Sequence, residues 1–355
     1  MINNVYALVD KICDEFVKVS SKYLAEESDS STKTKRIRQT VTKLKTHQFR
    51  DSVLIADKFL DNTFEQKLDD NPNLIGFNNG VYDHKNRYFR AGNPNDYISL
   101  SVGYDYEQYL QNDDIIREIK SFFSTVHPDI NMQKYILTFI ASCLEGINKD
   151  NRFTIWKGKN GSNGISSTFG LILYTFGDYF GVLRSTVLTK EYDLDSATPE
   201  LAHAKGKRFV MIQELDYNAV IYTGLIKLLS GSDYIVARPL YGDRFIYRPQ
   251  FKMVLACNKL PQLSSNDEGA FRRILVSPWE SEFVNKPLSH QYQKDPQLMN
   301  KIKTWKSAFM WLLLNEYYPE YCEHGLRVPE KVIEETRNYR ENCNPSWKFL
   351  TAHSC

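Results

Sequence analysis

Residues 153–168, FTIWKGKNGSNGISST, combine a short apolar run, a glycine-rich turn and the start of a helix. Backbone N–H groups at such a turn, and at the helix N-terminus that follows, form a cradle for the phosphates of a nucleotide. The segment therefore predicts a buried strand, a phosphate-binding loop and a helix. This order of elements favours an α/β fold.

The loop departs from the phosphate-loop pattern G-x-x-x-x-G-K-[ST]. Its first glycine is replaced by Lys159, and Ile165 stands where a lysine normally reaches the β- and γ-phosphates. Ser166 falls where a hydroxyl binds Mg²⁺. A glycine-rich turn that binds nothing is the alternative. The predicted nucleotide-binding residues are Lys159, Asn160, Gly161, Ser162, Asn163, Gly164, Ile165, Ser166 and Ser167.

Loss of the lysine should harm turnover more than binding. Removing a preorganised donor to a transition state lowers a rate by about 10²–10³. Backbone N–H groups, the helix N-terminus and Mg²⁺ would still favour nucleotide binding. Lys157 or Lys159 could reach the phosphates from the other side of the loop. Ile165 is compatible with both an engineered change and a natural inactivation.

Two further apolar runs end in polar side chains. Residues 207–216, KRFVMIQELD, predict a parallel strand that ends at Glu214, a candidate to hold the metal or polarise the attacking water. Residues 251–257, FKMVLAC, predict a strand that leads into Asn258, whose amide can bind the γ-phosphate or the water. A helix cap is the alternative role for a strand-terminal acid.

Arg272 and Arg273 precede another apolar run, ILVSPW. A rigid guanidinium at this place could complete the site of a neighbouring subunit as an arginine finger. A surface salt bridge is the alternative.

Residues 235–248 predict a hairpin that turns at Gly242-Asp243. Basic and aromatic side chains alternate along it, and such a tip can hold a phosphate backbone by charge and stack bases on its rings. Tyrosines that pack locally are the alternative. The residues concerned are Arg238, Tyr241, Arg244, Tyr247 and Arg248, with Lys227 as a nearby candidate.

Composition limits the possible partners. The 355 residues carry 45 basic and 43 acidic side chains, a net charge of +2, so DNA affinity must come from a local patch. The basic stretch 31–50 is most simply a solvated helix face, and a DNA contact is the alternative. Six scattered cysteines form no C-x-x-C pair, which suggests a reducing compartment such as the cytoplasm. We expect neither a signal peptide nor a membrane-spanning run.

Periodicity predicts the remaining organisation. We expect an amphipathic helix over 5–23, whose apolar face comprises Val5, Leu8, Ile12, Phe16, Val19 and Tyr23. We also expect helices over much of 32–60, 113–125, 132–145, 298–317 and 329–339, and a hairpin over 76–90 that turns at Lys85-Asn86. The expected domains are a helical segment 1–70, a domain 71–150, an α/β core 151–285 and a helical segment 286–355.

Residues 158–283 resemble the ATPase core of superfamily 3 helicases, specifically the poxvirus-type primase-helicases of large DNA viruses, phages and plasmids. The most specific stretch is 226–261, IKLLSGSDYIVARPLYGDRFIYRPQFKMVLACNKLP. Residues 73–106 are similar to the domain that precedes this core in the family. The segment PEKVIEETRNYRENCNPSWKFL resembles the one that follows it.

The resemblance implies an AAA+-like parallel-sheet core in a homo-oligomeric ring, commonly a hexamer. Such a ring uses ATP and Mg²⁺ to move along single-stranded or forked DNA, together with other replication proteins. Residues 161–166 would hold phosphate and metal, Glu214 would be the acid, Asn258 the sensor, and Arg272 or Arg273 the finger. It also implies a fragment of a longer protein, one that works in the host cytoplasm if the source is viral.

Two functions of different classes follow. The ordered motifs favour an ATP-dependent DNA helicase core. Ile165 favours a hydrolysis-deficient ring that binds DNA or partner proteins. A phosphate-loop kinase is disfavoured, because no segment resembles a phosphoacceptor lid and the hairpin would be unexplained.

Overall fold

A computed structural model describes residues 2–26, 32–44, 46, 67–159, 161–192, 196–213 and 219–343. The chain forms two compact units. One comprises Met1–Asp70 with Tyr97–Ser99, and the other comprises Asn71–Asp96 with Leu100–Cys355. The predicted four-domain division stays a prediction.

The first unit contains two helices, α1 (Ile2–Glu26) and α2 (Thr32–Leu44), which pack on each other. The amphipathic first helix is as predicted, but its buried face is not. Ile12, Phe16 and Val19 are exposed, whereas Cys13 and Ser20 are buried. The periodicity of apolar residues therefore located the helix correctly and its buried side wrongly.

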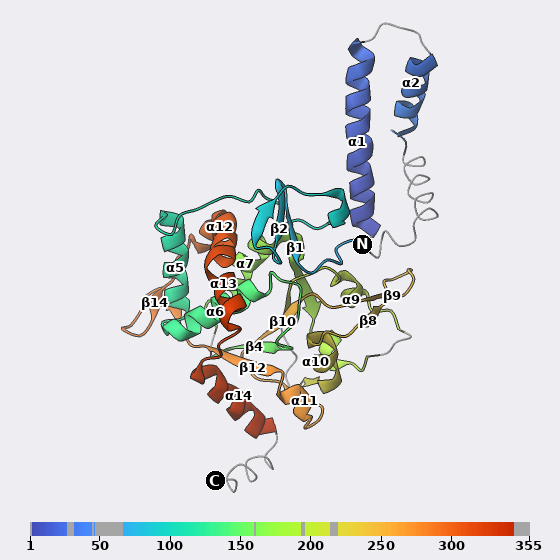
Figure 1. Cartoon of the computed structure of the whole chain (residues 1–355). Coiled ribbons are helices and arrows are strands. Elements are labelled where there is room, and N and C mark those ends of the chain that lie inside the picture. Colours follow the sequence, from blue (N-terminus) through green and yellow to red (C-terminus); the bar gives the residue numbers. More distant parts are fainter. Residues whose placement is uncertain are drawn as a thin grey trace. The chain divides into compact units, whose positions relative to one another are not determined.

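The second unit is built on a five-stranded parallel sheet in the order β12-β4-β10-β6-β5 (Figure 1). This sheet confirms the predicted α/β class. Four of its strands, β4, β6, β10 and β12, were predicted from apolar runs, whereas β5 was not. The strands are β4 (Phe153–Gly158), β5 (Phe180–Arg184), β6 (Phe209–Gln213), β10 (Lys252–Cys257) and β12 (Ile274–Trp279).

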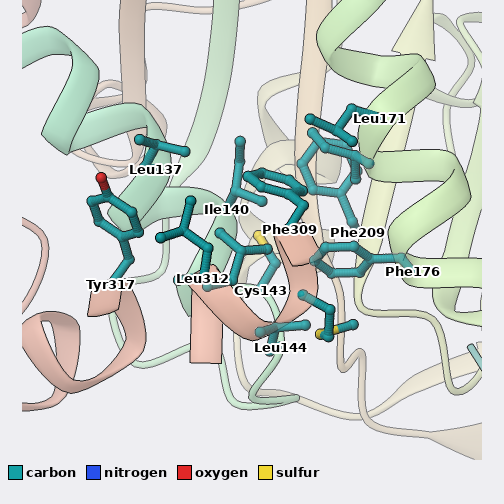
Figure 2. Close-up of a cluster of buried hydrophobic side chains, with 14 of the residues drawn as sticks. Leu137, Ile140, Cys143, Leu144, Leu171, Phe176, Phe209, Phe309, Leu312 and Tyr317 are labelled. Carbon is teal, nitrogen blue, oxygen red and sulfur yellow. The ribbon is translucent and has the colours of Figure 1, made fainter. Parts of the chain in front are cut away.

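Side chains alternate between the two faces of this sheet, as the period of a strand requires. Trp156 and Phe209 belong to one hydrophobic cluster, and Ile155 and Val210 belong to the other. The first cluster is covered by α6 (Ile130–Ser142), α7 (Ile165–Phe176) and α12 (Leu298–Leu312). Figure 2 shows its centre, where Leu137, Ile140, Cys143, Leu144, Leu171, Phe176, Phe209, Phe309, Leu312 and Tyr317 meet.

The predicted helix 298–317 continues further than expected. α12 passes through a π-helical turn, Leu313–Tyr317, into α13 (Tyr318–His324), and the helical run stops before Gly325, whose φ is 67°. α5 (Asp114–Val126) packs on α12. α14 (Glu330–Cys343) packs on the edge strand β12, where the Val276 N–H donates to Thr336 Oγ1 at 2.9 Å. This bond satisfies a donor that an edge strand would otherwise leave unpaired.

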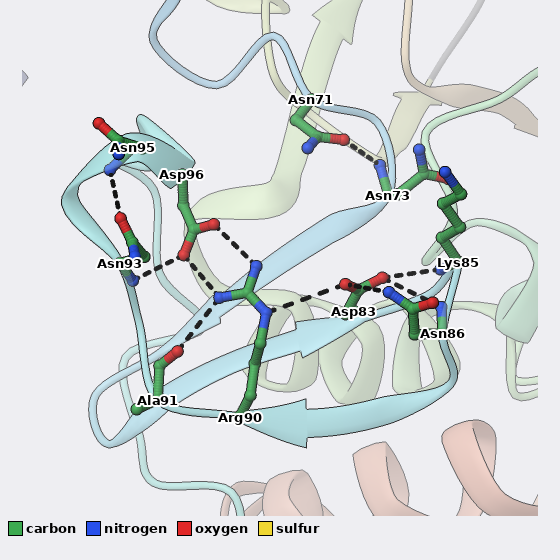
Figure 3. A network of polar contacts seen from close by, with 10 residues as sticks. All are labelled: Asn71, Asn73, Asp83, Lys85, Asn86, Arg90, Ala91, Asn93, Asn95 and Asp96. Carbon is green, nitrogen blue, oxygen red and sulfur yellow. Dashed lines mark hydrogen bonds and ion pairs between the residues drawn. The ribbon is translucent and has the colours of Figure 1, made fainter.

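Before the parallel sheet, β1 (Leu74–Phe77), β2 (Gly80–Asp83) and β3 (Tyr88–Arg90) form an antiparallel sheet. The turn after β2 contains the predicted Lys85-Asn86, and Asp83 Oδ1 accepts from both of their backbone N–H groups (Figure 3). Arg90 binds Asp96 through both terminal nitrogens. The second unit thus begins with a sheet whose turn is held by its own side chains.

Arg208 joins the antiparallel sheet to the parallel one. It is 1% exposed, it lies directly before β6, and its Nη2 donates to the carbonyl oxygens of Asn71 and Leu74, both at 3.2 Å. A buried guanidinium needs such partners to offset its lost hydration.

The remaining elements are short. Those that bear on the site are α10 (Thr223–Ser230), the β8 (Ile235–Ala237) and β9 (Phe245–Tyr247) pair, α11 (Glu268–Phe271), β13 (Phe283–Val284) and β14 (Tyr292–Gln293). The others are η1 (Pro94–Asp96), η2 (Gly177–Tyr179), α8 (Thr186–Thr189), α9 (Pro199–His203), β7 (Val220–Ile221) and β11 (Gln262–Leu263). Within the described ranges, no helix has the length and apolar character that crossing a membrane requires.

Candidate functional site

The predicted phosphate loop lies between β4 and α7, at the carboxyl edge of the parallel sheet (Figure 1). Ser162 and Gly164 have positive φ values of 61° and 89°, so the backbone takes the left-handed conformation that a tight turn needs. α7 begins at Ile165, whose N–H donates to Asn163 Oδ1 at 3.2 Å. Ser166 is exposed and Ser167 half-buried at the same helix start. Asn160 lies outside the described residues.

Ile165 belongs to the hydrophobic core. Its side chain is 8% exposed and forms part of the cluster that contains Trp156 and Phe169. An isoleucine stabilises this position by burial, whereas an ammonium here would have to extend out of apolar surroundings. The residue that breaks the sequence pattern is therefore well accommodated by the fold.

The two lysines near the loop differ. Lys157 Nζ pairs with Glu335 Oε2 of α14 at 3.0 Å, which favours a structural role over the predicted reach toward phosphate. Lys159 is exposed at the beginning of the loop.

The strand that leads to Asn258, β10, lies beside the strand that leads to the loop, β4. β10 pairs with β4 on one side and β6 on the other, so Asn258 leaves the sheet next to Gly158. A Cβ built on Gly158 would lie 2.8 Å from Asn258 Oδ1 and 2.0 Å from Asn163 Nδ2. Both amides thus occupy the space that a side chain at Gly158 would fill.

Glu214, the predicted acid, lies outside the described residues. It directly follows Gln213, which is the last residue of β6 and pairs with Ala256 of β10. Parallel strands end at one edge of a sheet, so the strand that leads to Glu214 runs toward the loop's edge.

The two arginines lie at the opposite edge. The Phe153 N–H donates to the Arg273 carbonyl oxygen at 2.8 Å, which places both arginines at the start of β4 and not at its loop end. A six-residue strand spans about 20 Å. These guanidinium groups are therefore far from the predicted phosphate loop of their own chain.

Arg272 and Arg273 have different surroundings. Arg273 is half-buried, and its Nη1 donates to the Lys227 carbonyl oxygen at 3.0 Å and to Ser230 Oγ at 3.3 Å, at the C-terminus of α10. Arg272 is exposed and donates from Nε to the Glu268 carbonyl oxygen at 3.3 Å. Its two terminal nitrogens have no protein partner in the described part of the chain.

Lys227 forms an ion pair with Asp267, with 2.5 Å between Nζ and Oδ2. The hydrogen bond from Lys227 lowers the pKa of the Asp267 carboxyl below its usual value. This pairing favours a structural role for Lys227.

The hairpin of β8 and β9 is antiparallel, with Ala237 opposite Phe245. Three of the predicted DNA-binding side chains are exposed at its tip, namely Arg238, Tyr241 and Arg244. Tyr241 is fully exposed.

Two other members of the basic and aromatic pattern do not reach the tip. Tyr247 is 3% exposed, and its OH donates to the Leu201 carbonyl oxygen at 2.6 Å. The prediction that Tyr247 is one of the exposed basic and aromatic side chains of the hairpin was wrong, because Tyr247 points to the buried face of its strand. Arg248 lies 4.9 Å from the centre of the ring of Tyr234, a residue that the predicted pattern did not include.

No group of three or more His, Cys, Asp or Glu side chains that could hold a metal occurs among the described residues. Five of the six cysteines lie in that part of the chain, and all five are free thiols. Ser166 is the one described member of the predicted Mg²⁺ pair, since Glu214 is outside these ranges.

Comparison with known proteins finds a family that matches part of the chain. Residues 2–141 match the family described as "D5 N terminal like". L207/L206 of Acanthamoeba polyphaga mimivirus, a protein provisionally named a helicase, is 36% identical over 329 residues that cover 88% of this chain and 34% of that protein. Primase D5 of Fowlpox virus is 27% identical over 289 residues, with coverage of 75% and 36%.

The chain spans about a third of the length of these relatives. A solved structure, the apo form of the NrS-1 C-terminal region (305–718), has a TM-score of 0.50 and 12% identity, and the match covers 70% of this chain and 56% of that one. At this identity the similarity concerns the fold alone. The family match and the viral relatives together show that the chain belongs to the poxvirus-type primase-helicase family.

Proposed function

We propose that this chain is the nucleotide-binding core of an ATP-dependent DNA helicase that acts in viral DNA replication. One observation carries the proposal. The asparagine strand β10 lies between the loop strand β4 and the acid strand β6, so the carboxyl ends of all three meet at one edge of the sheet. Phosphoryl transfer requires phosphate, metal and water to be positioned together in this way. The helicase and primase names of the relatives agree with it.

In the proposed site, the backbone N–H groups of residues 161–166 hold the triphosphate. Ser166 and Glu214 would hold Mg²⁺, and Glu214 would also polarise the attacking water. Asn258 orients that water or the γ-phosphate. The proposal includes an AAA+-like architecture of the sheet and its helices. It also includes action of the protein in the host cytoplasm, together with other replication proteins.

The proposal includes a ring, commonly a hexamer, and the position of the arginines supports a site shared between subunits. Because they lie at the edge opposite the loop, a guanidinium can complete a site only in a neighbouring subunit. Arg272 suits this role better than Arg273, since the side chain of Arg273 is held at the end of α10.

We assign the contact with single-stranded or forked DNA to the hairpin tip. Arg238 and Arg244 supply charge, and Tyr241 supplies a ring on which a base can stack. Lys227 is a weaker candidate because of its ion pair with Asp267.

A second function is favoured by the burial of Ile165. With no ammonium at this position, the chain would be a hydrolysis-deficient ring that binds DNA or partner proteins. Backbone N–H groups would still bind nucleotide in this case.

One experiment separates the two functions. ATP turnover is measured with and without single-stranded DNA for this chain and for Ile165→Lys, alongside DNA binding by both. DNA-stimulated turnover by the unaltered chain supports the helicase, and turnover by the lysine form alone identifies an inactivated helicase scaffold. DNA binding without turnover in either form supports the hydrolysis-deficient ring. A chain that binds neither nucleotide nor DNA would contradict both.

A further inference from the structure

A cavity of about 200 Å³ is lined by the end of α5, the segment after β12 and Tyr292 of β14, among others. β12 and β4 pair so that Trp279 lies opposite Gly158, and both are the last residues of their strands. Glu280, which lines the cavity, and Lys159, which begins the loop, therefore leave the same edge of the sheet from neighbouring strands.

The loop and the cavity share a wall. A Cβ built on Gly164 would lie 2.9 Å from Val126 Cγ2, and Val126 also lines the cavity. Ser281, another lining residue, donates from Oγ to the Thr125 carbonyl oxygen at 2.8 Å, which ties the end of α5 to the segment after β12. A ligand on the loop would thus lie next to the cavity.

The lining suits a neutral ring and not an anion. Met132, Pro278 and Tyr292 supply apolar and aromatic surface. Two carboxylates, Asp129 and Glu280, also line the cavity. The Asp129 carboxylate would repel phosphate.

His127 adds an uncharged ring to this lining. It is 4% exposed, and burial lowers its pKa to about 3, with the positive charge of Lys331 as a smaller cause. The imidazole is therefore neutral at pH 7, and it does not give the cavity a positive charge that would attract phosphate. Lys331 lines the cavity as well, but its ammonium is paired with the Glu280 carboxylate.

A direct structural link joins the cavity to the loop. The Phe283 N–H donates to the Ser162 carbonyl oxygen at 2.9 Å, and Phe283 pairs with Tyr292 in the β13 and β14 ladder. The rings of Phe283 and Tyr292 lie 5.7 Å apart between centroids. The position of the Tyr292 ring is thereby fixed relative to the loop.

We infer that this cavity binds the nucleobase of the nucleotide whose phosphates lie on residues 161–166, with the base stacked on Tyr292. The inference rests on the proposed nucleotide-binding function. Pockets for drug-sized ligands measure about 300–1,000 Å³, so a smaller cavity suits one planar ring system better than a whole nucleotide.

The test compares two ligands that share phosphates and differ in the base. Equilibrium affinities for Mg²⁺-ATP and for inorganic tripolyphosphate are measured on the full chain, on Tyr292→Ala and on Tyr88→Ala. Tyr88 is a matched control because it is an exposed tyrosine of β3 that does not line the cavity. We expect Tyr292→Ala to weaken ATP binding roughly 10-fold and leave tripolyphosphate binding unchanged. Tyr88→Ala should alter neither.

The outcomes separate this inference from the function on which it rests. Equal affinity of the unaltered chain for ATP and tripolyphosphate, or an equal effect of Tyr292→Ala on both, would overturn the base site and leave the phosphate loop intact. Binding of neither ligand would overturn the proposed function and the base site with it.

A measurement on the unaltered chain avoids any folding defect of a variant. Photo-crosslinking with 8-azido-ATP should label peptides that contain residues 126–132 or 278–292. Labelling confined to other peptides would contradict the proposal.

Discussion

At the scale of single residues, the shape of the predicted phosphate loop depends on a glycine that has no side chain. Gly158 leaves room for the amides of Asn163 and Asn258, one from the loop and one from the strand beside it. A Cβ built on Gly161, in the same loop, would meet no atom of the described residues within 4 Å. A methyl group added at Gly158 would therefore clash with these amides, whereas one added at Gly161 would have room.

We predict that Gly158→Ala lowers the free energy of unfolding by about 1–3 kcal/mol, the usual cost of overpacking. Gly161→Ala is the matched control and should change it much less. Thermal denaturation of both variants measures the difference. Equal melting temperatures for the two variants would show that the amides move aside without cost.

Two buried histidines should make the protein sensitive to acid. Burial lowers the pKa of both His84 and His127 to about 3. In the unfolded chain the pKa is about 6.5, so the unfolded state binds more protons than the folded state between these values. The stability that these groups contribute is therefore fully present above about pH 6.5 and falls as pH decreases toward 3.

We predict that His84→Phe reduces the loss of folding stability at acidic pH. His84 lies between the rings of Tyr82 and Tyr318, at centroid distances of 5.0 and 4.7 Å, so a phenyl ring suits the site. The free energy of unfolding is measured at pH 7 and pH 5 for both proteins. Each histidine contributes up to about 1.4 kcal/mol per pH unit in this window. An unchanged pH dependence in the variant would contradict the assignment to His84.

At the scale of elements, the hairpin of β8 and β9 presents its tip while its base is anchored. Tyr247 at the base is buried, and the backbone N–H of Arg238, where the tip begins, donates to Thr198 Oγ1 at 3.0 Å. Tyr241 at the tip is fully exposed. An anchored base holds the tip side chains in place for contact with a partner.

We predict that Tyr241→Ala weakens binding of single-stranded DNA by about 1–3 kcal/mol, the usual contribution of one stacked base. Arg238→Ala or Arg244→Ala should each reduce the slope of log affinity against log salt by about 0.7. Lys227→Ala, whose side chain is paired with Asp267, is the control and should have a smaller effect. Fluorescence anisotropy at several salt concentrations measures all four. A larger effect for Lys227→Ala would move the DNA contact away from the hairpin.

At the scale of the whole molecule, the parallel sheet separates the two halves of the proposed site. The loop lies at the carboxyl edge, and the arginines lie at the opposite edge. A complete site of the proposed kind therefore needs two copies of the chain. This arrangement is heterologous, and heterologous contacts close into rings when the rotation between subunits allows it.

We predict that Arg272→Ala abolishes turnover in the Ile165→Lys background without lowering thermal stability. Arg273→Ala should lower thermal stability, because it removes the hydrogen bonds at the end of α10. Mixing Arg272→Ala subunits with Glu214→Gln subunits should restore part of the turnover, since one of the mixed interfaces is intact. Failure of the mixture to regain activity would exclude a role of Arg272 across the interface.

The sequence alone determined the α/β class, the glycine-rich turn between strand and helix, and the strands that lead to Glu214 and Asn258. These are local patterns: apolar runs of strand length, a cluster of turn-forming residues, and polar residues at strand ends. Periodicity also located the long helices. It could not locate β5, because FGVLR is short and carries a glycine and an arginine among its apolar residues.

Only the tertiary structure decided which side chains meet. It placed Ile165 in the core, held Arg273 and Lys227 in local contacts, and turned Tyr247 to the buried face of its strand. It also brought Val126 and Phe283 to the loop from positions distant in sequence. The physical reason is that sequence spacing predicts the face of an element, whereas contacts between elements depend on how the faces pack.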